Sequence, residues 1–278
     1  VATLLLGAVL ALFQHDLKGL LAYSTISHLG LITLLFGLDR PLAVVAGVFH
    51  IINHATFKAS LFMAAGIIDH ESGSRDMRRL HGLYRHMPYT ATLAMTAAAA
   101  MAGVPLLNGF LSKEMFFAET LLLGERGALA WALPVVATLA GLFSVAYSVR
   151  FIHDVFFNGT AVDLPRTPHE PPRWMRVPVE LLVLLCLLVG VLPGLTVAPL
   201  LHLAAGAAYG GPLPPYSLAV WHGLNLPLLM SVLALVGGVA VYVGLHRWVD
   251  LHTLELTAYS GKAAFERLLA GLLAGARQ

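Results

Sequence analysis

Residues 42–68 read LAVVAGVFHIINHATFKASLFMAAGII, and this stretch decides what kind of fold the chain can adopt. Its only side chain with a full charge at neutral pH is that of Lys58, and apolar runs flank it on both sides. An α-helix needs about 20 mostly apolar residues to cross a bilayer. The stretch is therefore predicted to be a membrane-spanning helix that carries polar side chains in its middle.

The composition extends this interpretation to the whole chain. Of the 278 residues, 58% are hydrophobic and 12% are charged, whereas a soluble domain has about 25% charged residues. So little polar surface cannot cover a globule of this length, and most of the chain is expected to face lipid. We predict an all-α, polytopic transmembrane helix bundle of about seven spans. The spans are residues 1–14, 17–38, 42–68, 89–123, 129–157, 177–201 and 221–245.

The fourth span is too long for a simple crossing and contains residues that interrupt helices. Gly103-Val104-Pro105 and Asn108-Gly109 lie near its middle. Proline removes a backbone donor and glycine weakens the helix, and such breaks are tolerated at membrane depth where they face protein or line a cavity. The sequence therefore predicts one broken helix near residues 103–109, a feature that often marks an ion pathway.

Basic residues are distributed unevenly among the predicted loops. With seven crossings, the loops at 69–87 and 158–176 fall on the same face, together with the C-terminal tail. Arg40 and Arg126 fall on the opposite face. Because cytoplasmic loops carry an excess of Lys and Arg, loops 69–87 and 158–176 are predicted to be cytoplasmic.

The two ends of the chain and its single cysteine carry less information. The chain begins with Val1 inside an apolar run, so we read it as a piece of a longer protein. Residues 253–274 mix charges with leucine and alanine, which is typical of an interfacial amphipathic helix. Cys186 lies in an apolar run and can form no disulfide within the chain. A net charge of +2 is too small to indicate a nucleic-acid partner.

The central stripe of span 42–68 is the strongest functional signal. His50, His54 and Lys58 are spaced at i, i+4 and i+8, so they share one helix face over roughly 12 Å of membrane depth. A buried charge is costly in a membrane and usually functional, and histidine exchanges protons near neutral pH. We interpret the stripe as a proton relay. Two alternatives remain: structural hydrogen bonding with a snorkelling lysine, or a zinc site, which lacks a third ligand on this face.

Lys113 is the second buried cation, directly after the predicted break. A lysine there can reach water and freed backbone carbonyls. Lys18, at the start of the second span, is explained equally well by function or by snorkelling. Ser24 and His28 could join Lys18 to the stripe, and Glu114 is a further candidate. Near the ends of two later spans, an interfacial position accounts for four more polar residues. These are Arg150, His153, Asp154 and Glu180.

Three motifs resemble the antiporter-like subunits of respiratory complex I and the Mrp-type antiporters. They are DLKGLLAYSTISHLG (16–30), HIINHATFKASLFMAAG (50–66) and GVPLLNGFLSKE (103–114). Within that superfamily, FSVAYSVRFIHDVFF (143–157) and PHEPPRWMRVPVELL (168–182) are most similar to the A subunit of the Mrp multisubunit Na+/H+ antiporter. The resemblance is strong up to about residue 200. It implies a bundle in which a hydrated chain of Lys, His and Glu conducts protons, and it carries that role onto matched positions. These are Lys18, His50, His54, Lys58 and Lys113.

The resemblance also implies what the protein does and what it lacks. Residues 1–201 would be the C-terminal part of the proton-translocating module, and residues 202–278 a further span and an amphipathic cytoplasmic segment. The family's first broken helix and its glutamate-bearing helix would lie upstream of Val1. The implied function is a secondary transporter that exchanges Na+ for H+, rather than an enzyme. Its partners would be other subunits of the complex and membrane lipid in a bacterial inner membrane. No cofactor, metal or nucleic acid is expected. The alternative is a proton-pumping subunit of an NADH:quinone oxidoreductase or membrane-bound hydrogenase.

Overall fold

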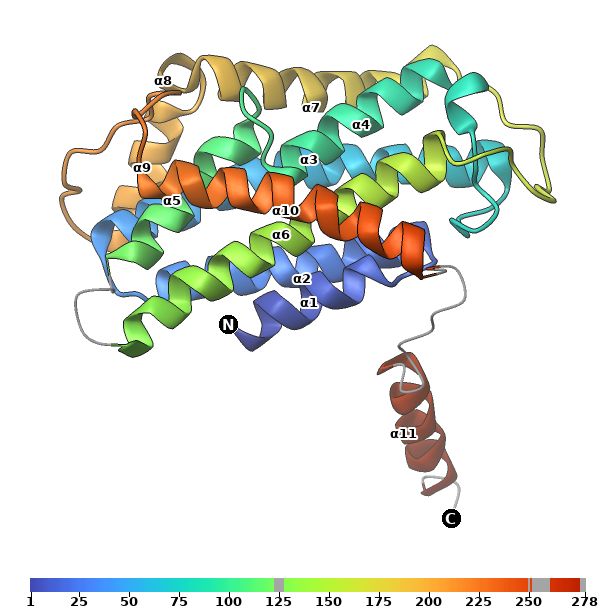
Figure 1. The fold of residues 1–278 in the computed structure, drawn as a ribbon, viewed down its shortest axis with the longest axis horizontal. Helices are drawn as coiled ribbons and strands as arrows, with labels where there is room; N and C mark the ends of the chain where they lie inside the picture. Colours follow the sequence, from blue (N-terminus) through green and yellow to red (C-terminus); the bar gives the residue numbers. More distant parts are fainter. Residues whose placement is uncertain (123–127, 250, 252–260, 276–278) are drawn as a thin grey trace.

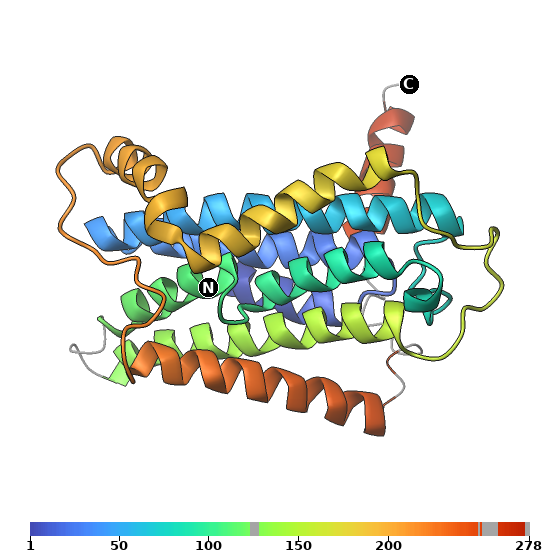
Figure 2. The same cartoon turned by 90° about the horizontal axis from the view of Figure 1, so that it is seen from above.

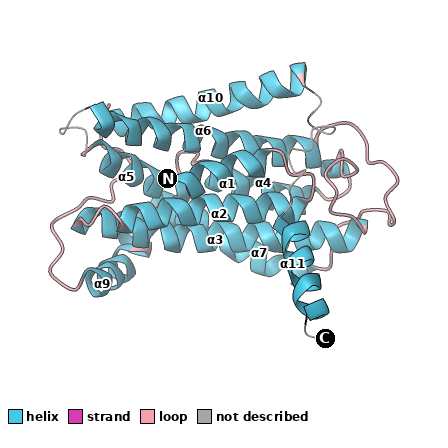
Figure 3. Cartoon of the chain, turned by 90° about the horizontal axis from the view of Figure 1, so that it is seen from below, coloured by secondary structure: helices cyan, strands magenta, loops and turns pink. Residues whose placement is uncertain are grey.

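The computed structural model describes residues 1–122, 128–249, 251 and 261–275. Within these residues every regular element is a helix, and the only β-type contact is an isolated bridge between Asp16 and Asp76. The predicted all-α fold is confirmed (Figures 1 and 3). The helices are α1 (Ala2–Leu12), α2 (Leu17–Phe36), α3 (Pro41–Ser72), η1 (Leu83–Arg85), α4 (Pro88–Ala102), α5 (Asn108–Leu121), α6 (Ala128–Phe156), α7 (Arg173–Val191), α8 (Pro193–Thr196), α9 (Ala198–Tyr209), α10 (Leu226–Trp248) and α11 (Gly261–Gly275).

The long helices lie side by side as a bundle (Figures 1 and 2). Five of them, α2, α3, α6, α7 and α10, are long and apolar enough to cross a membrane. Helix α1 is apolar but shorter, and α4 and α5 follow one another as two half-helices. Together with α1 and the α4–α5 pair, these five helices correspond one for one to the seven segments that the sequence predicts, and α1 covers only 11 residues of the first of them.

Local sequence sets where several helices begin and end. The Asp16 carboxylate accepts a hydrogen bond from the Gly19 amide at 2.7 Å and so caps the start of α2. Pro41 occupies the first turn of α3, where no backbone donor is needed. The same helix ends at Gly73, whose φ of 72° suits glycine better than residues with a side chain.

The predicted break divides the fourth span into α4 and α5, with residues 103–107 between them. Gly103 ends α4 with φ of 89°. Gly109 lies so close to α4 that an added Cβ would fall 1.8 Å from the carbonyl oxygen of Ala100. Gly190 of α7 approaches the linker similarly, since its Cβ would lie 2.2 Å from the oxygen of Leu106. The break is therefore a tightly packed feature of the interior.

The sixth and seventh spans differ from their predicted limits. The sixth was expected to continue to residue 201, but α7 ends at Val191, before Pro193, because a residue that precedes proline disfavours helical backbone. Helix α9 then covers 12 residues, about 18 Å, which is too short to cross the roughly 30 Å hydrocarbon layer. The seventh span begins at Leu226 rather than near residue 221, because the Asn225 side chain caps α10 by accepting from the Leu228 amide.

The basic loops gather at one end of the bundle, at the right in Figure 1. Leu17 donates to the carbonyl of Arg75 at 2.8 Å, and Val162 donates to that of Arg79 at 3.1 Å. These bonds tie three loops together, residues 13–16, 73–87 and 157–172. Arg40 lies near the opposite end, where it pairs with Glu119 at 3.4 Å. Arg126, Glu255, Arg277 and the side chain of Lys262 lie outside the described residues.

Candidate functional site

The predicted stripe lies on α3 as the spacing indicates. His50 is fully buried, Lys58 is 4% exposed, and His54 is partly buried. The Lys58 ammonium donates to the Ser24 hydroxyl and to the Leu21 carbonyl at 3.1 Å, both on α2. Lys58 is therefore bound by polar groups inside the bundle and does not snorkel to an end.

Histidines from two helices meet beside this stripe. Nδ1 of His28 on α2 lies 2.9 Å from Nε2 of His50, and the two rings stack with centroids 5.1 Å apart. The other nitrogen of His50 lies 3.0 Å from the Ser112 hydroxyl on α5. His54 packs against the His28 ring at 5.1 Å, and its buried Nε2 has no hydrogen-bond partner among the described residues. Two helices thus supply the imidazoles of one cluster, and α5 adds the Ser112 hydroxyl.

A tyrosine and a serine of α6 connect this cluster to the second buried lysine. The Tyr147 hydroxyl lies 3.2 Å from Nε2 of His28 and donates to the Ser144 hydroxyl at 3.0 Å. The Lys113 ammonium donates to the same Ser144 hydroxyl at 2.9 Å. The result is an unbroken sequence of polar contacts that we call the polar thread. Its members are Ser112, His50, His28, Tyr147, Ser144 and Lys113.

The break in the fourth span provides backbone carbonyls that bind the Lys113 ammonium. Its ammonium donates to the carbonyls of Met101 at 2.7 Å and Ala102 at 3.0 Å. These carbonyls belong to the last turn of α4, which has no following helical residues to bond with, and a helix C-terminus favours a positive charge. The aliphatic part of Lys113 passes over Gly103, where an added Cβ would lie 2.9 Å from its Cδ.

A small cavity of about 20 Å³ lies along the polar thread, lined in part by His28, Lys113, Ser144 and Tyr147. A cavity of roughly 10–15 Å³ holds one water molecule when polar partners surround it. The cavity is therefore large enough for one water that could bridge the imidazole and the ammonium. Direct contacts and a cavity of the volume of one water molecule together define the interior of the candidate site.

Two of the predicted site residues lie apart from the polar thread. Lys18 pairs with Asp69 at 2.7 Å, and the two side chains are 36% and 34% exposed. Glu114 faces a separate cavity of about 290 Å³ that Glu119, Tyr216 and Asn225 also line, and its carboxylate lies 3.7 Å from His222. The structure therefore brings together His50 and Lys113 with His28, and holds Lys58 and Ser24 beside them, but not Lys18 or Glu114.

Sequence reasoning missed Tyr147 and Ser144. Both are buried, and they are three residues apart in an otherwise apolar segment. Residues at i and i+3 share a helix face, and this spacing was the signal that could have found them. A tyrosine in an apolar span is usually taken for a packing residue, and its hydroxyl was overlooked for that reason.

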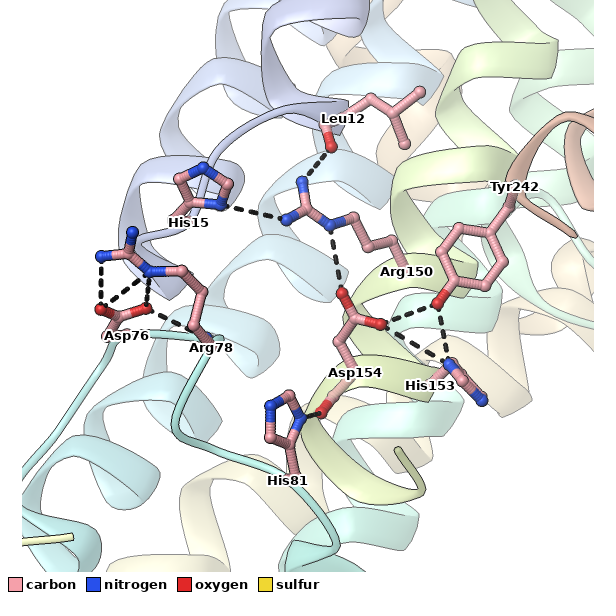
Figure 4. Close-up of polar contacts among 9 residues, drawn as sticks. All are labelled: Leu12, His15, Asp76, Arg78, His81, Arg150, His153, Asp154 and Tyr242. Carbon is pink, nitrogen blue, oxygen red and sulfur yellow. Dashed lines mark hydrogen bonds and ion pairs between the residues drawn. The ribbon is translucent and has the colours of Figure 1, made fainter. Parts of the chain in front are cut away.

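A second polar cluster lies further along α6, near its end. Arg150 and Asp154 are expected at the membrane interface, and they do lie in the last two turns of the helix, but protein covers their side chains, which are 0% and 1% exposed. Arg150 Nε donates to Asp154 Oδ2 at 3.2 Å, and a further guanidinium nitrogen donates to the Leu12 carbonyl at the end of α1 (Figure 4). The Tyr242 hydroxyl donates to Asp154 Oδ1 at 2.7 Å. We call Arg150, Asp154, Tyr242 and His153 the arginine cluster.

Residues 1–145 match a protein-family model described as NADH:quinone oxidoreductase/Mrp antiporter, TM. This match covers more than half of the chain, so the chain belongs to that family of membrane proteins. Among curated relatives it is 62% identical over 269 residues to the A/B subunit of a probable K(+)/H(+) antiporter of Rhizobium meliloti, covering 97% of this chain and 26% of that protein. It is 35% identical to the A subunit of the Na(+)/H(+) antiporter of Bacillus subtilis, covering 96% of this chain and 36% of that protein.

The solved structures that resemble this chain also come from an Mrp complex and from respiratory complex I. The Mrp complex of Dietzia sp. DQ12-45-1b contains a chain that is 37% identical, with a TM-score of 0.80 over 99% of this chain and 29% of that one. Respiratory complex I of Thermus thermophilus contains one that is 27% identical, with a TM-score of 0.64 over 75% of this chain and 42% of that one. The chain spans about a quarter to a third of the length of these curated relatives.

Proposed function

We propose that this chain is a proton-conducting part of the A subunit of an Mrp-type multisubunit antiporter, which exchanges a monovalent cation for H+ across a bacterial cell membrane. The observation that carries the proposal is the polar thread, a continuous set of contacts between Lys113 and His50. Its members are buried, and each can donate or accept a proton. A structural role would need hydrogen-bonded side chains but not an uninterrupted sequence of them.

Proton transfer along the polar thread needs bonds that can reverse direction. The hydroxyls of Ser144 and Tyr147 can rotate, and neutral His28 and His50 can exchange donor and acceptor nitrogens by changing tautomer. A proton delivered at Lys113 would pass through Ser144 and Tyr147 to the imidazoles. Lys58 would join this route from the side, through Ser24 and any water that reaches His54.

Coupling to the cation would be electrostatic. A positive charge on one group changes the protonation of its neighbours, so the buried amines and imidazoles titrate as a set. Any cation that binds in the same assembly and interacts differently with the charged and neutral states shifts that equilibrium, and the proton shifts the cation's affinity in return. We assign Na+ as the exchanged cation, with K+ as the competing choice because of the Rhizobium meliloti relative.

The orientation and the partners belong to the same proposal. The end that holds loops 69–87 and 158–176 would face the cytoplasm, because it carries most of the Lys and Arg residues. Many side chains of α7 and α10 are apolar and exposed, including Leu181, Leu184, Val232 and Val236. Lipid and other subunits would cover them. No step of the proposed transfer needs a cofactor.

The deciding experiment replaces both buried amines in the complete complex. Lys58→Ala with Lys113→Ala should reduce the Na+- and K+-induced pH change in everted vesicles to background. Arg85→Ala, at an exposed position at the end of η1, is the matched control for loss of a basic residue and should exchange normally. Retained exchange in the double variant, with the complex assembled, would overturn the proposal.

A second candidate is a proton-pumping subunit driven by redox chemistry, which the likeness to respiratory complex I supports. That likeness covers 75% of the chain, whereas the likeness to the Mrp complex covers 99%. Proteins that purify with the native complex separate the two: flavin and iron–sulfur subunits would favour the redox pump, and further membrane subunits alone would favour the antiporter.

A further inference from the structure

Two histidines and an aspartate converge where the ends of α6 and α10 meet, away from the polar thread. His153 and Asp154 belong to the last turns of α6, and His246 belongs to the last turn of α10. One ligand atom from each of the three lies within 4.8 Å of the others. We propose that these three residues form a binding site for a divalent transition metal ion of the zinc class.

The packing of the two helices fixes this convergence. Gly238 of α10 lies so close to α6 that an added Cβ would fall 2.5 Å from the Leu142 carbonyl oxygen. About one and two turns later, Tyr242 and His246 stack on the same face of α10, with ring centroids 5.8 Å apart. The His246 ring meets the His153 ring edge to face at 5.2 Å. The site therefore depends on a rigid crossing rather than on mobile loops.

The donor set and its geometry suit zinc. Zn2+ with two imidazoles and one carboxylate leaves a fourth position for water, and tetrahedral bonds of about 2.0–2.1 Å place neighbouring ligand atoms about 3.4 Å apart. His153 Nδ1 and Asp154 Oδ1 are 3.5 Å apart. His246 is exposed and can complete the site by a change of rotamer. Imidazole nitrogen favours Zn2+, Cu2+ or Ni2+ over Mg2+ and Ca2+, which prefer oxygen ligands.

The neighbouring residues define what binding would change. The Tyr242 oxygen lies 2.8 Å from His153 Nδ1 and 2.7 Å from Asp154 Oδ1, so a metal ion would replace the hydrogen bonds that it makes there. Asp154 Oδ2 stays with Arg150 on the other side. The positive charge of that guanidinium repels the metal ion and keeps the affinity of the site for the metal moderate. Binding would join α6 to α10 at the end where the basic loops lie.

The test measures Zn2+ binding to the purified complete complex after chelator treatment, by calorimetry with Mg2+ as the competing ion. The wild type should bind one Zn2+ at this site and ignore Mg2+. His246→Ala and His153→Ala should each lower the affinity for Zn2+ by at least about tenfold. Loss of a residue that only hydrogen-bonds to a metal ligand already lowers metal affinity by about that factor, and loss of the ligand itself should lower it at least as much. His202→Ala, which removes another exposed histidine, should leave binding unchanged. Asp154 is left intact, because its loss would leave Arg150 unpaired.

A second variant gives a gain of signal. In His246→Cys the thiolate is itself a zinc-type ligand, so Co2+ binding should persist and add a thiolate-to-Co2+ charge-transfer band that the wild type lacks. Equal Zn2+ affinity in the wild type, His153→Ala and His246→Ala, or a cysteine variant without the band, would overturn the site. Neither readout measures transport, so the result for the metal site is independent of the proposed function.

Discussion

Helix α6 carries two polar regions that are buried in the bundle, and the two regions stabilise a buried positive charge by different kinds of contact. In the polar thread, Tyr147 and Ser144 join groups that can each give up or receive a proton. In the arginine cluster, one turn away, Arg150 is held by Asp154, the Leu12 carbonyl and His15. Arginine stays charged in proteins, so this cluster is a fixed ion pair. The two regions therefore differ in whether their contacts can reverse direction, and the proposed conduction depends on that reversibility rather than on buried charge alone.

The largest effect is expected from breaking the ion pair. Asp154→Ala leaves the Arg150 guanidinium buried without its carboxylate, and loss of one partner of a buried pair costs about 3–5 kcal/mol. Thermal unfolding of the complex in detergent should show a large drop in the midpoint. The double variant Arg150→Met with Asp154→Leu removes both charges and should be considerably more stable than Asp154→Ala. An equally unstable double variant would mean that the charges do not account for the loss.

Tyr147→Phe tests the other region of α6. It removes the hydroxyl between His28 and Ser144 and leaves the ring in place, so the polar thread is interrupted. Because a positioned proton-transfer group contributes about 100-fold or more, exchange in vesicles should fall by about that factor while the complex still assembles. An unchanged exchange rate would show that protons bypass Tyr147.

Tyr242→Phe is the matched change in the arginine cluster. It removes the hydrogen bond to the Asp154 carboxylate and the contact with His153 Nδ1, and a bond to a charged group contributes about 1.5–3 kcal/mol. We expect a lower unfolding midpoint with exchange retained, which is the reverse of the Tyr147→Phe result. If both phenylalanine variants lose exchange equally, the distinction between the two regions fails.

Lys18→Ala should have the smallest effect. Its pair with Asp69 is about one-third exposed on each side, and pairs of this kind contribute less than about 1 kcal/mol. Exchange should fall less than about tenfold, since within the part of the chain that the structure describes Lys18 bonds to Asp69 and to no member of the polar thread. A loss as large as that of the lysine double variant would place Lys18 in the pathway, as the sequence resemblance implies.

Periodicity and composition were sufficient to predict the main features of the fold. Apolar runs located the spans, and Gly103, Pro105 and Gly109 located the break. The limit of α7 was missed because residues 192–201 are mostly apolar, although Pro193 and Pro199 interrupt them. Apolar composition cannot distinguish a crossing helix from one that folds back.

The candidate site was predictable where one helix supplied the pattern. The i, i+4, i+8 spacing along α3 identifies His50, His54 and Lys58 from the sequence alone. The burial of Arg150 was not predictable, because its partner carbonyl at Leu12 is 138 residues away in the sequence. The His28–Tyr147 contact joins residues 119 positions apart. Contacts of this kind depend on which helices become neighbours, and neither periodicity nor hydropathy carries that information.

Gly109 and Gly190 have no chemistry of their own, yet they determine where the Lys113 ammonium is held. Gly109→Ala would meet the Ala100 oxygen and push α5 away from α4, and Gly190→Ala would meet the Leu106 oxygen and push α7 away from the linker between these half-helices. The amine would then lose its register with the carbonyls of Met101 and Ala102. A mutational survey confined to ionisable side chains would pass over both glycines, although a single methyl group at either one would disturb the packing that positions this amine.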